Sequence, residues 1–134
     1  MLIRLIYASQ VAVPLTPLAV QQIVERARAA NQRRHITGVL AFDSHSFLQV
    51  LEGDREAVSE VFCHIAKDSR HHHLQLLESV AVDERQFSTW SMGFAAADAH
   101  GRETFLRHSC DDHFAPCNLT AKGALGLLSA LTAQ

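Results

Sequence analysis

The hydrophobic and polar positions near the start of the chain follow two different periods. From Leu2 to Tyr7 the apolar side chains alternate between two faces, so that every second one shares a face, which is typical of a β-strand. Thr16 then occupies a preferred helix N-cap position, Pro17 suits the first helical residue, and apolar residues recur at helical spacing up to about Asn31. The pattern predicts a strand followed by an amphipathic helix.

The middle of the chain predicts a β-hairpin, a second helix and two further strands. Asp43 and Ser44 separate two apolar runs, as expected for hairpin strands of which the first is buried on both faces. Gly53 and Asp54 then end a strand and cap a helix. The predicted ranges are 36–42 and 46–52 for the hairpin strands, 55–69 for the helix, and 74–82 and 90–95 for the last two strands.

The element order βαββαββ predicts an α+β fold, a ferredoxin-like sheet with two helices on one face. In a split βαβ arrangement the third strand fills the gap that the right-handed crossover leaves beside the first strand, so these two strands are expected to be neighbours. After residue 97 a short polar segment and Pro116 precede a leucine-containing stretch from Leu119 to Leu131. We expect a C-terminal helical cap on the open face of the sheet, with a partner-docking helix as the alternative. The chain is thus divided into residues 1–97 and a helical extension, residues 98–134, that packs on them.

Composition narrows the class of protein. The chain has 134 residues, 48% of them hydrophobic and 19% charged, with a net charge of −2, which describes one globular domain. Its longest basic run is Arg33-Arg34, which argues against a nucleic-acid partner. Its apolar runs are shorter than the roughly 20 residues of a membrane span, and its opening is too short for a signal peptide. The three isolated cysteines are expected to be free thiols, and we expect a cytoplasmic protein.

Three uncharged polar residues need more explanation than the fold provides. Gln49 lies among apolar strand residues on the face that should be core, and a buried amide must find partners, most often backbone groups. Tyr7, the only tyrosine, lies on the neighbouring strand and could meet Gln49, or its hydroxyl could reach the edge of the sheet. Asn31 is most simply a helix terminus. Together, however, the three suit hydrogen bonding to the edge of a planar heterocycle.

Several stretches of the chain match one known family. They are Leu5-Ile6-Tyr7-Ala8-Ser9, Ile36-Thr37-Gly38-Val39-Leu40, Phe47-Leu48-Gln49-Val50-Leu51-Glu52-Gly53 and Trp90-Ser91-Met92-Gly93-Phe94, with weaker matches at Asp68-Ser69-Arg70-His71 and Arg85-Gln86-Phe87. On these residues the chain resembles the BLUF family, blue-light receptors that hold a flavin non-covalently in a ferredoxin-like domain. The resemblance covers about residues 2–95 and implies that residues 1–97 form a BLUF photosensor domain.

The resemblance also implies a role for each polar residue. Tyr7 would be the light-driven electron and proton donor, and Gln49 would bridge its hydroxyl to the flavin ring. After the electron and the proton return, the amide of Gln49 is left rearranged, and the altered hydrogen bonds give a small red shift. Asn31 would hold the carbonyl edge of the ring, and Ile23 and Ile65 would form the aliphatic walls of its pocket, although ordinary core packing explains both isoleucines equally well.

Two further groups of residues have implied roles. Asp68, Arg70 and His71 would contact the ribityl and phosphate part of the cofactor, with a solvated charged turn as the alternative. FAD is the usual flavin of the family, and FMN or riboflavin could also fit. Trp90 and Met92 would relay the signal. Because they alternate by two on the predicted last strand, we expect them to share a face, and the sequence leaves open which of them lies beside Gln49.

Some positions count against other functions or depart from the family. Ala30 and His64 stand where relatives often have a polar and a basic residue, which weakens expectations about the ribityl and phosphate side. His71-His72-His73 could suggest a metal, but consecutive strand residues point to opposite faces, so no metal site is predicted.

The sequence therefore predicts a photoreceptor and not an enzyme. Its signal would pass to a separate, unidentified downstream protein, through a change in a homo-oligomer, or both. A ferredoxin-like interaction module without a chromophore is the alternative. A small flavin-dependent oxidoreductase is a third option, which the lack of an evident substrate base disfavours.

Overall fold

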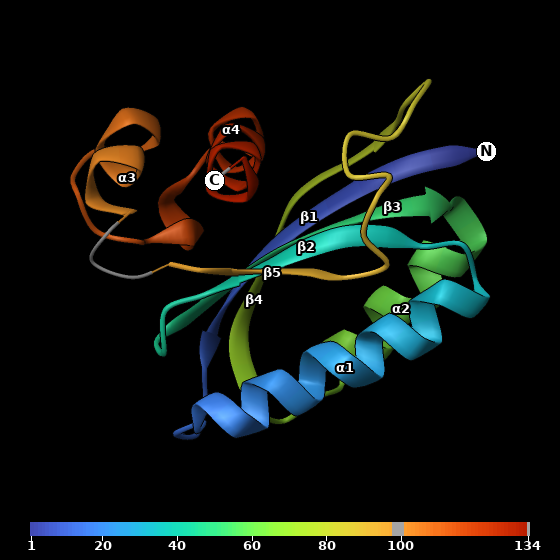
Figure 1. Cartoon of the computed structure of the whole chain (residues 1–134), viewed down its shortest axis with the longest axis horizontal. Helices are drawn as coiled ribbons and strands as arrows, with labels where there is room; N and C mark the ends of the chain where they lie inside the picture. The colour runs from blue at the N-terminus through green and yellow to red at the C-terminus, as the bar shows by residue number, and fades with distance from the viewer. Residues whose placement is uncertain (98–100, 134) are drawn as a thin grey trace.

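The protein is a three-layer α+β structure in which a five-stranded sheet separates two helical layers (Figure 1). The computed structural model describes residues 1–97 and 101–133. Helices α1 and α2 cover one face of the sheet, and α3 and α4 lie on the other. The elements are β1 (Leu2–Val11), α1 (Pro17–Arg33), β2 (Thr37–Phe42), β3 (Ser46–Asp54), α2 (Arg55–Ala66), β4 (His71–Ala81), β5 (Gly93–Ala96), α3 (Arg102–His108), the 3-10 turn η2 (Pro116–Asn118) and α4 (Ala121–Thr132).

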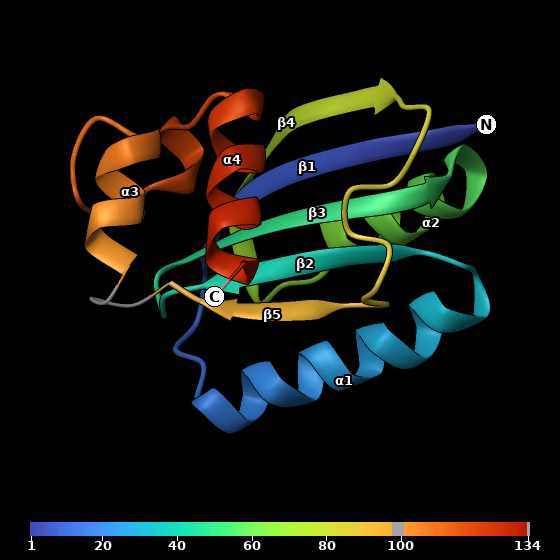
Figure 2. The ribbon, with the colours of Figure 1, turned by 45° about the horizontal axis from the view of Figure 1, so that its top comes forward.

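The strand order in the sheet is β4-β1-β3-β2-β5 (Figure 2). Strand β1 runs antiparallel to both β3 and β4, β2 is antiparallel to β3, and β2 and β5 are parallel. The predicted neighbourhood of the first and third strands is confirmed. In their register, Tyr7 lies directly opposite Gln49.

The predicted helix starts are confirmed in atomic detail. The Thr16 side chain accepts a hydrogen bond of 3.1 Å from the backbone N–H of Ala19 and so caps α1. The Asp54 carboxylate accepts one of 3.3 Å from the N–H of Glu56 and caps α2. Each cap satisfies an N–H group that the first helical turn leaves without a partner.

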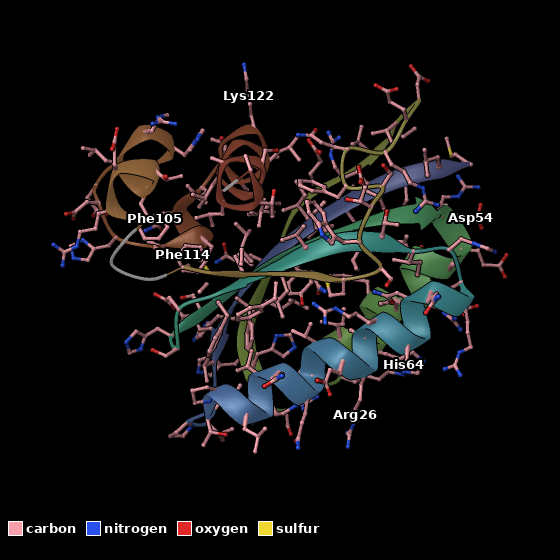
Figure 3. The ribbon with its side chains drawn as sticks, in the orientation of Figure 1. Arg26, Asp54, His64, Phe105, Phe114 and Lys122 are labelled. Carbon is pink, nitrogen blue, oxygen red and sulfur yellow. The ribbon has the colours of Figure 1, made fainter. Side chains whose placement is uncertain are left out.

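Each face of the sheet carries its own hydrophobic core, because the side chains of a strand alternate between faces. The core under α1 and α2 includes Leu5, Tyr7, Val24, Leu40, Phe47, Leu51, Val58 and Met92. The core under α3 and α4 includes Ile6, Val39, Leu48, Val50, Phe87, Phe105, Phe114, Leu127 and Leu128. Phe105 and Phe114 are labelled on that side in Figure 3. The predicted C-terminal helical cap is therefore present, and β2 and β3 are buried on both faces. Residues 98–100 and 134 of the predicted extension lie outside the described residues, and its division from residues 1–97 stays a prediction.

The predicted start of the last strand, at residue 90, is wrong, and so is the expectation that Trp90 and Met92 share a face. Strand β5 begins at Gly93, so Trp90 and Met92 precede it and the alternation of a strand does not apply to them. Trp90 is 38% exposed whereas Met92 is 1% exposed, and they do not share a face. The physical reason is that side chains of α1 hydrogen-bond the backbone carbonyls of this segment. Asn31 donates to the carbonyl of Ser91, and Arg28 donates to that of Met92.

Other predicted boundaries differ less. Strand β4 begins three residues earlier than predicted, at His71, and α2 ends at Ala66. Helix α3, which spans Arg102–His108, was predicted as a polar segment because seven residues show too little helical period. Among the described residues no helix has the length and hydropathy needed to cross a bilayer.

Candidate functional site

A cavity of about 500 Å³ lies between helices α1 and α2 and the sheet. Side chains from both helices, from β1, β2 and β3 and from the turn before β4 line it. The structure brings all eight residues with a predicted cofactor-binding role to this one cavity: Tyr7, Ile23, Asn31, Gln49, Ile65, Asp68, Arg70 and His71. Their roles toward a cofactor remain predictions.

The buried end of the cavity holds a chain of side-chain hydrogen bonds. The Tyr7 hydroxyl donates to Gln49 Oε1 at 2.5 Å, and Gln49 Nε2 donates to Met92 Sδ at 3.3 Å. All three residues are at most 4% exposed. Of the two residues that the sequence left open, Met92 is therefore the one beside Gln49.

The protonation state of Tyr7 follows from its surroundings. Burial raises the pKa of the phenol well above its usual value of 10.0, and the negative charge of Asp68 raises it further. Tyr7 is therefore neutral in the folded protein near pH 7, and its proton stays available for donation to Gln49.

Asn31 and the apolar walls shape the rest of the cavity. Asn31 is 2% exposed and lies within the last turns of α1, where its Nδ2 donates to the carbonyl of Ser91 at 3.0 Å. Its side-chain oxygen accepts no hydrogen bond from the described residues, so it can accept one from a bound ring. Ile23 of α1 and Ile65 of α2, both partly buried, form walls together with Leu40, Phe47 and Val61.

The charged turn before β4 is organised by an ion pair. The Arg70 guanidinium hydrogen-bonds the Asp68 carboxylate, and chiefly for this reason the pKa of Asp68 is lowered to about 2. His71 Nε2 lies 2.6 Å from the carbonyl of Ile65, which can only accept, so this nitrogen carries the proton. Its Nδ1 lies 2.8 Å from Ser9 Oγ, so both ring nitrogens are occupied within the protein.

Three arginines of the cavity and one buried carboxylate were not predicted from the sequence. Arg26, Arg33 and Arg34 line the cavity and are exposed. The exposed His64, which the sequence placed on the ribityl and phosphate side, lines it as well. Figure 3 labels Arg26 on α1 and His64 on α2, both on the face of the sheet that these two helices cover. For the α1 residues a signal was present, since Arg26 and Arg33 recur at helical spacing from Ile23, which was assigned to the cavity.

The other missed residue is Glu52, which is 0% exposed. Its carboxylate accepts hydrogen bonds from the backbone N–H groups of Gln86, at 3.0 Å, and Phe87, at 2.7 Å. The Gln86 side chain in turn donates to Ser129 Oγ of α4 at 2.6 Å. A charged residue at the end of an otherwise apolar strand was the available signal.

The cavity suits a planar heteroaromatic ring. Apolar walls face each other from two helices, while Tyr7, Gln49 and Asn31 supply hydrogen-bonding groups at the buried end. After its contacts to Tyr7 and Met92, the Gln49 amide retains one N–H and one oxygen lone pair. These groups are placed to bond a ring edge, so the residues present fit a flavin.

Fold and site together define a cofactor-binding sensor domain of the α+β class. The family model described as BLUF, sensors of blue-light using FAD, matches residues 2–93, and the chain belongs to this family. Residues 2–93 therefore form a domain of a family of blue-light sensors that use a flavin. This confirms the predicted function and favours it over an interaction module without a chromophore.

The similar proteins differ in how much of them the chain covers. It is 36% identical over 88 residues to photoactivated adenylate cyclase subunit alpha of Euglena gracilis, covering 66% of the chain and 9% of the relative. It is 28% identical over 120 residues to the blue light- and temperature-regulated antirepressor BluF of Escherichia coli (strain K12), covering 90% of the chain and 30% of the relative. The solved structure of BlsA in its photo-activated state is 32% identical, with a TM-score of 0.89, over 100% of this chain and 96% of that one.

Proposed function

We propose that the protein is a photoreceptor in which Tyr7, Gln49 and Met92 convert the absorption of blue light into a structural change of the segment that joins β4 and β5. The observation that carries this proposal is the position of Gln49. Its amide is hydrogen-bonded to Tyr7 on one side and to Met92 on the other, and it lines the cavity.

The cofactor is FAD, and FMN or riboflavin would fill the same ring pocket. When bound, a flavin supplies blue-light absorption and, once excited, a strong one-electron oxidant. With the flavin bound, Tyr7 would be the donor of one electron to the ring, and its phenolic proton would follow to the ring by way of the hydrogen bond to Gln49. Both would return to Tyr7, so the cycle would leave no net oxidation of the protein.

Gln49 retains the effect of light because its amide has two unlike ends. If the amide turns over, Oε1 and Nε2 exchange places, and the groups presented to Tyr7, to Met92 and to the ring change from acceptor to donor or the reverse. After such a turn Met92 Sδ would face Oε1 in place of the N–H of Nε2. Because the thioether sulfur and Oε1 are both acceptors, no hydrogen bond can form between them. Loss of the hydrogen bond between Gln49 and Met92 would therefore pass the rearrangement of the amide to the backbone of the segment that joins β4 and β5.

The contacts of the β4–β5 segment suggest where the signal leaves. The backbone carbonyls of Ser91 and Met92 accept hydrogen bonds from α1. The backbone N–H groups of Gln86 and Phe87 donate hydrogen bonds to the carboxylate of Glu52 in β3. Gln86 also bonds α4, so a shift of this segment would change the packing of the C-terminal helices. Trp90 is partly exposed on the same segment and could report the change at the surface.

The receiver of the signal is a separate downstream protein or a second copy of the chain in a homo-oligomer. Coupling requires that the receiver bind the dark and lit forms with different affinity. We place the protein in the cytoplasm, because Cys63, Cys110 and Cys117 are free thiols, as is usual in a reducing compartment.

One visible-region spectrum tests the proposal. The purified protein should be yellow, and blue light should shift its flavin absorption slightly to the red, reversibly in the dark. A protein that is colourless and cannot be reconstituted with FAD, FMN or riboflavin would contradict it, as would a bound flavin whose spectrum does not respond to light.

A further inference from the structure

The mouth of the cavity is positively charged although the chain as a whole is not. The chain has a net charge of −2. The residues that line the cavity nevertheless include four arginines, Arg26, Arg33, Arg34 and Arg70, but a single carboxylate, Asp68. Such a local excess attracts an anion even where the overall charge would not.

The four arginines are not equally available. Arg70 is bonded to Asp68, and Arg34 lies 2.8 Å from the carboxylate of Glu60. Within residues 1–97 and 101–133, Arg26 and Arg33 form no ion pair, and both are exposed. These two guanidinium groups are therefore free to bind a ligand without breaking an existing pair.

Their spacing on α1 suits a single anionic group at the mouth. Arg26 and Arg33 are about 10 Å apart along the helix axis, and Ala30 lies between them on the same side. The small side chain of Ala30 leaves the space between the two arginines open. Two long, flexible arginines at this spacing can flank one phosphate from either side, and guanidinium groups match phosphate oxygens well.

The two ends of the cavity therefore favour different parts of one ligand. The buried end offers uncharged hydrogen-bonding groups to a ring, whereas the mouth offers cations. We propose that Arg26 and Arg33 form a phosphate-binding subsite, which makes this chain prefer the phosphorylated flavins FMN and FAD to riboflavin. The inference rests on the proposed function, since it names the form of flavin that the same cavity selects.

A binding titration of the flavin-free chain with riboflavin, FMN and FAD tests the subsite. At low salt we expect FMN and FAD to bind about tenfold more tightly than riboflavin, the factor that two partly exposed charge pairs supply together. At about 0.5 M NaCl this advantage should largely disappear, because exposed charges are screened, while riboflavin binding should change little.

A double variant and a matched control locate the effect. R26Q/R33Q should lose the preference for FMN at low salt, with riboflavin affinity changed less than twofold. R102Q/R107Q removes the same charge from exposed positions on α3, on the opposite side of the sheet, and should keep the preference. An equal loss in both variants would show a general charge effect and overturn the subsite.

The remaining outcomes separate this inference from the proposed function. Equal affinity for riboflavin and FMN at low salt would overturn the phosphate subsite alone, since a flavin still binds. A preference that R26Q/R33Q retains would also overturn it. Failure of all three flavins to bind would contradict both the subsite and the proposed photoreceptor.

Discussion

The amide of Gln49 lies in hydrogen-bond contact with the sulfur of Met92, at 3.3 Å, across the core between the sheet and α1. The backbone oxygen of the same methionine accepts a bond of 2.7 Å from Arg28 of α1. Met92 is therefore held at its side chain by β3 and at its backbone by a helix. A change at Gln49 alters one of these two attachments and leaves the other in place.

Removing the hydroxyl of Tyr7 should separate flavin binding from photochemistry. Tyr7→Phe keeps the ring in the core but removes the electron and proton donor, so we expect a bound flavin with no light-induced red shift. The lost hydrogen bond to Gln49 should lower the free energy of unfolding by about 1 kcal/mol. Difference spectra before and after illumination and a denaturant titration measure the two effects, and a normal photocycle in this variant would refute Tyr7 as the donor.

Gln49 follows Tyr7 in the chain of hydrogen bonds, and Gln49→Leu should abolish the light-induced red shift. Leucine is similar in size but offers neither the acceptor that Tyr7 uses nor the donor to Met92. We expect a flavin spectrum that is fixed under blue light, and a loss of about 1–3 kcal/mol in the free energy of unfolding because the buried Tyr7 hydroxyl has no partner. A reversible red shift of ordinary size in Gln49→Leu would show that the amide is not the element that light rearranges.

Met92 and Trp90 should differ in their effect on the signal, because the first is buried against Gln49 and the second is partly exposed. Met92→Leu conserves volume, costs less than about 1.5 kcal/mol, and removes the sulfur acceptor. We expect the red shift to persist, with dark recovery altered several-fold and with the light-dependent hydrogen exchange of residues 85–92 lost. Trp90→Phe is the control variant, and it should leave the rate of dark recovery and the light-dependent hydrogen exchange close to those of wild type. Equal effects of the two variants would contradict the assignment of Met92 as the relay.

Glu52 should hold the β4–β5 segment in place through its carboxylate. Glu52→Gln keeps the shape of the side chain but replaces a charged acceptor of backbone N–H bonds by an amide. Because hydrogen bonds to a charged group are about twice as strong as neutral ones, we expect the free energy of unfolding to fall by about 2–3 kcal/mol. Denaturant unfolding measures this, with the exposed Glu56→Gln as control. A loss no larger than that of the control would show that the carboxylate does not anchor Gln86 and Phe87.

The sheet and the adjacency of its first and third strands followed from the alternation of apolar residues and the crossover rule, whereas most of the residues that line the cavity were predicted from the resemblance to the BLUF family. Alternation places Tyr7 and Gln49 on one face, and the crossover rule makes their strands adjacent. The orientation of Trp90 and Met92 was predicted wrongly, because it depends on α1 side chains that are about sixty positions away in the chain. The anchoring role of Glu52 was missed for the same reason, since its partners lie more than thirty residues later.

The ion pair between Asp68 and Arg70 gives the turn before β4 a defined dependence on pH. Hydrogen bonding to Arg70 lowers the pKa of Asp68 to about 2 in the folded protein, below its usual value of 3.8. A carboxyl group with a lowered pKa in the folded state stabilises the fold above its unfolded pKa and loses this contribution as the pH falls through the folded pKa. Wild type should therefore be more stable than Asp68→Asn at pH 6, and the difference should shrink between about pH 4 and pH 2. Denaturant titrations of both proteins across this range measure it, with the exposed Asp83→Asn as control for general acid effects. A difference that stays constant down to pH 2, or one that grows, would contradict the role of the ion pair.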